Sequence, residues 1–137
     1  MQPPIDHHTA LIFTMVLVSA AEGEMTDAEL DTIGRVVRYL PVFRGFNHDQ
    51  LTDVGRQCAE LLRHEDGLDR TTEMIAEALS QPLRETAYAV ACEVAAADGA
   101  LADEELNLLD MLRERLKVDR LVAAAIERTT CVRHTVA

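Results

Sequence analysis

The feature that most constrains this chain is a stretch of sequence that occurs twice. Residues 19–30 and residues 95–106 share one order: apolar residues, an acidic residue, a glycine, a short link, and an acidic segment that ends in leucine. Gly23 and Gly99 occupy the same place in the two copies. Glycine tolerates the left-handed conformation in which many helices end, and acidic residues are stabilised in the first turn of a helix. Each copy therefore predicts a helix, a tight turn and a second helix.

The rest of the chain favours an all-α fold. Its 137 residues are 48% hydrophobic but only 4% aromatic. Small and γ-branched side chains, which are plentiful here, suit helix packing better than a sheet core. No segment shows the alternation of a half-buried strand, and no low-complexity linker divides the chain. We therefore expect one all-α domain over residues 1–137, with about seven helices.

Capping residues and helix breakers set the expected boundaries. Asp6 can cap the first helix, Thr26 and Glu29 form a capping box at the second, and Asn47 can cap the third. The first helix is apolar on nearly every side, which is typical of a helix surrounded by others. The expected helices cover, approximately, residues 6–21, 26–40, 47–62, 69–79, 83–97, 103–116 and 119–128.

Apolar residues at spacings of three and four predict the buried face of each helix. Cys58 and Cys92 lie among such residues and should pack as small hydrophobic side chains. Glu93 has no partner evident in the sequence, so we expect it at the surface. The expected core includes Leu30, Ile33, Val37 and Leu40 in the second helix, Leu106, Leu109, Leu112 and Leu116 in the sixth, and Leu121, Val122, Ala125 and Ile126 in the seventh.

The charge balance restricts the ligands. The formal net charge is −11, so nucleic acids and anionic membrane surfaces would be repelled. Cations or a basic protein partner are the electrostatically favourable ligands. The apolar run over residues 10–21 is too short to span a bilayer and lacks the basic residues that precede a secretory signal. Three widely spaced cysteines argue against a disulfide framework and fit a cytoplasmic location.

The two acidic turns are the candidate functional sites. Carboxylates in a first helical turn are stabilised by about 0.3–1 kcal/mol, so capping alone can explain many of them. Glu22 and Asp98 differ, because they follow the C-terminal end of a helix, where an anion is disfavoured. Their recurrence at the same place suggests a hard divalent cation held by carboxylates and turn carbonyls. An ordinary Asp-Gly turn remains the alternative reading.

Known catalytic and metal motifs are missing from the sequence. An EF-hand would place ligands at Val94 and Ala96, and at Val18 and Ala20 in the first copy, where none of the side chains can ligate. No nucleophile motif, zinc motif or phosphate-binding loop occurs, so we do not expect an enzyme. The adjacent histidines near the start of the chain lack a third ligand and are expected to face solvent.

The motif Ala-Asp-Gly-Ala-Leu-Ala-Asp-Glu-Glu-Leu at residues 97–106, with its weaker upstream copy, resembles the tellurite-resistance TerB-like family. The N-terminal domain of the DnaJ-like membrane co-chaperone has a similar arrangement. The resemblance implies two central helices wrapped by the others and acidic residues proposed to bind metal near both turns. Glu22 stands where the family usually has Asp, and Ala102 stands where Thr26 caps the other copy. The implied metal ligands are Glu22, Asp27, Asp98 and Asp103, with Glu29 and Glu105 as additional candidates.

Two functions follow as hypotheses. The first is a non-enzymatic domain that binds or senses a divalent cation in bacterial tellurite or metal stress. The alternative is a helical protein–protein interaction module without a metal. That module would need an exposed apolar patch, for which we expect Val42, Phe43 and Phe46 to serve.

Overall fold

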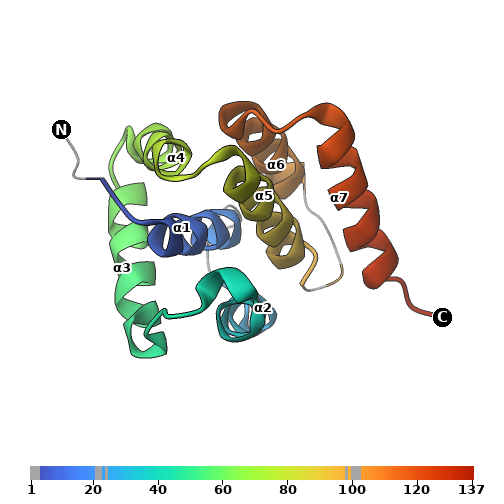
Figure 1. The fold of residues 1–137 in the computed structure, drawn as a ribbon, viewed down its shortest axis with the longest axis horizontal. Helices are drawn as coiled ribbons and strands as arrows, with labels where there is room; N and C mark the ends of the chain where they lie inside the picture. The colour runs from blue at the N-terminus through green and yellow to red at the C-terminus, as the bar shows by residue number, and fades with distance from the viewer. Residues whose placement is uncertain (1–3, 21–22, 24, 98, 100–102) are drawn as a thin grey trace.

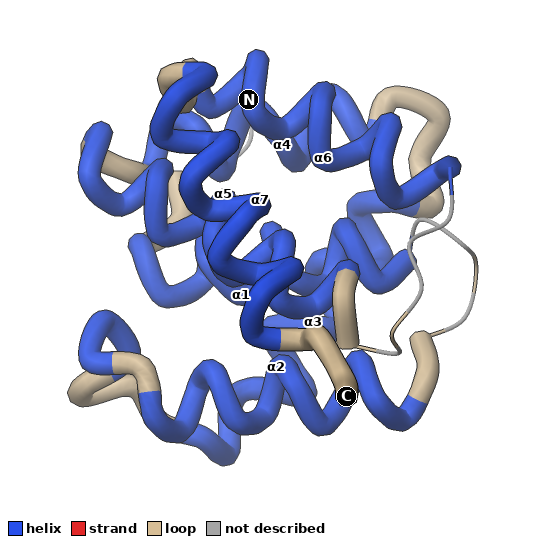
Figure 2. Tube along the Cα trace, turned by 90° about the vertical axis from the view of Figure 1, so that its right-hand side faces the viewer, coloured by secondary structure: helices blue, strands red, loops and turns tan. Residues whose placement is uncertain are grey.

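A computed structural model of the chain describes residues 4–20, 23, 25–97, 99 and 103–137 (Figure 1). Within these ranges all regular structure is helical, which confirms the all-α prediction (Figure 2). The helices are α1 (His7–Ser19), α2 (Asp27–Tyr39), α3 (Leu51–Leu62), α4 (Gly67–Ala78), α5 (Gln81–Ala95), α6 (Asp103–Leu116) and α7 (Arg120–Arg133). Two short 3-10 helices, η2 (Pro41–Phe43) and η3 (His48–Gln50), connect α2 to α3.

Helix α1 lies in the middle of the molecule. Every residue from Ala10 to Ser19 is buried, because α1 packs against α2, α3, α4 and α5 (Figure 1). The predicted cap is present, since the Asp6 carboxylate accepts a hydrogen bond from the Thr9 amide at 2.8 Å. In the part of the chain that the structure describes, no helix has both the length and the apolar character needed to cross a membrane.

Helix α5 is the second central helix and the counterpart of α1 in the repeat. It packs against α1 on one side and against α6 and α7 on the other (Figure 1). Its buried residues include Ala87, Val90, Ala91 and Val94, which are small enough for the close approach of α1. This confirms the expected arrangement of two apolar helices wrapped by the others.

Local signals placed the start of α2 and both turns correctly. The third helix begins later than expected, because Asn47 caps η3 and α3 starts at Leu51. At α2 the Thr26 hydroxyl accepts from the Glu29 amide at 3.1 Å, and the Glu29 carboxylate accepts from the Thr26 amide at 2.9 Å. These two bonds are the predicted capping box. Gly23 and Gly99 have φ of +108° and +83°, which only glycine adopts without strain. Both repeat copies therefore turn at the residue that the sequence indicated.

The predicted buried faces of α2, α6 and α7 were wrong in part. In α2, Leu30 is 51% exposed. Leu106 is 47% exposed and Leu121 is 82% exposed, although both lie on the apolar stripes. Ala125 is also exposed, whereas Ala123 and Thr130 are buried. Helix α7 lies at the edge of the molecule along α5, so only one narrow face of it is covered (Figure 1). The helix also continues to Arg133, beyond the expected end.

The connector after α2 does not form the exposed patch that we expected. Phe43 is only 3% exposed, and Val42 and Phe46 are half-buried against the core. The His8 ring stacks on Phe43 at a centroid distance of 5.6 Å, and its Nε2 lies 2.9 Å from the Val42 carbonyl. The connector therefore covers the start of α1, and His8 is part of this packing instead of facing solvent.

Two leucine-to-alanine substitutions test this assignment of the core. Leu112→Ala removes a side chain with no exposed surface, and we expect it to lower the free energy of unfolding by about 2–5 kcal/mol. Leu121→Ala is the matched control and should change it by less than about 0.5 kcal/mol, because that side chain faces solvent. Urea unfolding followed by circular dichroism measures both. Similar losses for the two variants would contradict the observed position of α7.

Candidate functional site

The acidic turns are described in part. Asp27 and Asp103 are exposed in the first turns of α2 and α6, as the sequence suggested. Glu22 and Asp98, the two carboxylates with the least favourable helix-dipole position, lie outside the described residues. The left-handed glycines beside them are described and have equivalent conformations. Each turn therefore has a glycine in the left-handed conformation and an exposed aspartate in the helix that follows.

Glu29 and Glu105 occupy equivalent positions and are both buried. Glu29 is 2% exposed and has its carboxylate in the capping box, and Glu105 has no exposed surface. These positions make the two side chains part of the helix packing. Among the residues that the structure describes, no three His, Cys, Asp or Glu side chains gather into a possible metal site. The described carboxylates that remain accessible in the first turns of α2 and α6 are Asp27, Asp103 and Glu104.

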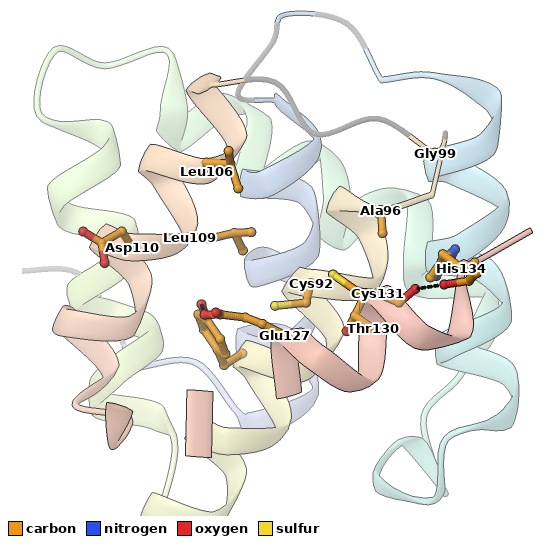
Figure 3. A pocket seen from close by; sticks show the side chains of 12 residues that line it. Cys92, Ala96, Gly99, Leu106, Leu109, Asp110, Glu127, Thr130, Cys131 and His134 are labelled. Carbon is orange, nitrogen blue, oxygen red and sulfur yellow. Dashed lines mark hydrogen bonds between the residues drawn. The ribbon is translucent and has the colours of Figure 1, made fainter. Parts of the chain in front are cut away.

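A cavity of about 550 Å³ lies between α5, α6 and α7 (Figure 3). Its volume falls within the range typical of small-molecule sites. In Figure 3, Leu106 and Leu109 point from α6 toward Cys92 and Cys131 on the other two helices. Most of the lining is apolar, with a few polar groups. The lining residues are Tyr88, Cys92, Ala96, Gly99, Leu106, Leu109, Asp110, Glu127, Thr130, Cys131, His134 and Thr135.

One polar pair joins two walls of this cavity. The Tyr88 hydroxyl on α5 donates to the Glu127 carboxylate on α7 at 2.6 Å. Burial, followed by this hydrogen bond, raises the pKa of Tyr88, so the phenol stays protonated and remains a donor. The bond also holds the Glu127 carboxylate at the cavity. Sequence reasoning missed both residues, because they are far apart in the chain and belong to no recognised motif.

A second polar contact holds the end of α7 near the cavity. The Glu93 carboxylate on α5 lies 2.6 Å from Arg133 Nη1 and 3.5 Å from His134 Nε2. The expectation that Glu93 stands at the surface without a partner was therefore wrong, since its side chain is only 20% exposed. Only the tertiary packing of α5 against α7 brings these residues together. Because Arg133 and His134 are bound in this way, neither is an unpaired cation at the cavity.

A comparison with protein-family models matches residues 8–128 to the family described as tellurite resistance protein TerB. The match spans α1 to most of α7 and includes both acidic turns. The chain belongs to the TerB family. Comparisons with curated proteins and with solved structures found no match. The similarity to the DnaJ-like co-chaperone stays a prediction.

The thiols of this TerB family member differ in their surroundings. Cys58 and Cys92 are buried, and burial raises the pKa of each thiol to about 12. Cys131 is exposed on α7, where it lines the same cavity as Cys92. All three cysteines have free thiols. The expectation that Cys58 and Cys92 pack as small hydrophobic residues is confirmed.

Alkylation should separate the three thiols. Only the thiolate reacts, and a pKa of about 12 instead of 9.0 reduces the thiolate fraction roughly a thousandfold near neutral pH. We expect iodoacetamide at pH 8 to modify Cys131 first and to leave Cys58 and Cys92 largely unmodified in the folded protein. Peptide mass spectrometry over a time course measures this. In concentrated denaturant all three should react alike, and equally fast labelling of Cys92 and Cys131 in the native protein would contradict the structure.

Proposed function

We propose that this TerB domain is a non-catalytic binding domain that holds a divalent cation at its acidic turns. The observation that supports this proposal is the equivalence of the two turns. Each passes through a left-handed glycine into a helix start that carries an exposed aspartate. The proposed ligands are Glu22 and Asp27 at the first turn and Asp98 and Asp103 at the second.

The donor chemistry indicates which ions to expect. Carboxylates and turn carbonyls are hard oxygen ligands, which suit Ca²⁺, Mg²⁺ or Mn²⁺ better than thiophilic metals. The net charge of −11 favours cation binding over the whole surface. Glu29 and Glu105 would act indirectly: they would stabilise the helix starts that carry Asp27 and Asp103.

The biological setting is part of the same proposal. Membership of a family described by tellurite resistance supports a role in the bacterial response to tellurite or metal stress. Three free thiols support a reducing, cytoplasmic environment. The alternative, a protein-docking module centred on Phe43, loses its expected surface because that side chain is buried.

Titration with divalent ions tests the proposal. We expect one or more of Ca²⁺, Mg²⁺, Mn²⁺ and Zn²⁺ to give a binding heat and to raise the melting temperature. At a hundredfold excess over the dissociation constant, binding to the native state alone adds about 2.7 kcal/mol of stability. The double variants Glu22→Gln/Asp27→Asn and Asp98→Asn/Asp103→Asn should each remove the contribution of one turn. Calorimetry measures the binding heat, and thermal unfolding measures the melting temperature.

The control variant is Asp53→Asn, which removes one exposed carboxylate from α3, away from both turns. This variant should show the same ion-induced rise in melting temperature as the unmodified protein. The shift is compared within each variant, because losing a first-turn aspartate lowers stability by itself. If no ion produces heat or a thermal shift, or if Asp53→Asn behaves like the turn variants, cation binding at the turns is wrong.

A further inference from the structure

The cavity between α5, α6 and α7 has a distinct charge pattern. Within its described lining there is no lysine or arginine, and its one histidine contacts Glu93. Two carboxylates belong to the lining. Asp110 lies 3.7 Å from Arg113 Nε and points away from Cys92 in Figure 3. Glu127 extends from α7 toward α6 and accepts a hydrogen bond from the neutral phenol of Tyr88. The cavity therefore presents one carboxylate that no neighbouring cation of the lining neutralises.

The apolar wall is also incompletely covered. Leu106 belongs to the same apolar stripe as Leu109 and Leu112, yet it remains 47% exposed because it lines the open side of the cavity. Together with Leu109 and Ala96 it forms a hydrophobic surface that a ligand would remove from water. Burial of apolar area is favourable. A ligand with an apolar body would therefore bury the part of this hydrophobic surface that remains exposed.

We propose that this cavity binds a small organic cation, with the apolar body against Leu106, Leu109 and Ala96 and the positive group beside the Glu127 carboxylate. The Tyr88 hydroxyl positions that carboxylate from the opposite wall. An anion of the same shape is disfavoured, because it would meet Glu127 in a protein of net charge −11. The side chains proposed to bind the organic cation differ from the carboxylates proposed to bind the divalent cation, although Gly99 of the second turn also lines the cavity.

Three probes that share a phenylethyl group separate the ionic and apolar contributions. The probes are 2-phenylethylammonium, 2-phenylethanol and 3-phenylpropionate, each titrated into the ¹⁵N-labelled full chain and followed by NMR. We expect saturable shifts in amides of α5, α6 and α7, with the ammonium binding at least tenfold more tightly than the carboxylate. Methylammonium, which has the charge but no apolar body, should give no saturable shift. Equal binding of cation and anion, or saturable binding of methylammonium, would overturn the proposal.

Two variants assign the contributions to residues. Glu127→Gln keeps an acceptor for the Tyr88 hydroxyl, so the fold is retained, and it should weaken the ammonium about tenfold or more while leaving the alcohol unchanged. Leu106→Ala should weaken all three probes by a similar factor. Leu121→Ala, on the exposed side of α7, is the matched control and should change none of them. Unchanged ammonium binding in Glu127→Gln would show the proposal to be wrong.

The same variant distinguishes this inference from the proposed function. Glu127→Gln should keep the thermal shift caused by divalent ions, because Glu127 is not a turn residue. Loss of ammonium binding with the ion response intact supports two separate sites. If Glu127→Gln lost both ammonium binding and the ion-induced thermal shift, the proposal of two separate sites would be contradicted.

Discussion

The burial of α1 is the constraint on which the rest of the structure depends. A helix without a polar face cannot lie at a surface, so other helices must cover it on every side. From Ala10 to Ser19 no side chain carries a charge, and the Thr14 hydroxyl is satisfied by the Ala10 carbonyl at 2.8 Å. Helix α1 therefore contributes no charge that must be desolvated when α2, α3, α4 and α5 close around it. The positions of those four helices follow from this requirement.

The repeat is symmetric in sequence but not in environment. Helices α1 and α5 are each followed by a left-handed glycine, and each precedes a helix with a buried glutamate. They differ in what covers their outer sides. Helix α5 carries Tyr88, Cys92 and Glu93 toward α7, where Glu127 and Arg133 provide polar partners. The cavity of about 550 Å³ lies on this side of α5.

One electrostatic preference connects the two proposed sites. The chain carries an excess of carboxylates over basic side chains. Two arginines make contacts between helices: Arg133 contacts Glu93, and Arg115 contacts Asp69 and Thr72. Exposed carboxylates then remain at the turns, and Glu127 remains at the cavity. Inorganic cations suit the oxygen-rich turns, whereas the hydrophobic wall of the cavity suits an organic cation. Gly99 lies at both places, since it forms the second turn and lines the cavity.

Local sequence signals determined the elements and their ends. The Asp6 cap, the Thr26–Glu29 capping box and the two glycine turns depend on residues a few positions apart, whose hydrogen bonds form within one or two helical turns. The all-apolar pattern of α1 likewise fixed its central place. The family resemblance, carried by the motif around Gly99, was predictable for the same reason.

Only the tertiary structure decided which faces were covered. An apolar stripe predicts the side of a helix that prefers burial but does not specify whether a neighbouring helix reaches it. Leu121 stayed exposed because only a narrow face of α7 is covered, and Leu106 stayed exposed because it lines the cavity. Phe43 became buried because its connector folds over the start of α1. The Tyr88–Glu127 and Glu93–Arg133 contacts join residues about forty positions apart. Such pairs depend on how whole helices pack, which no local pattern encodes.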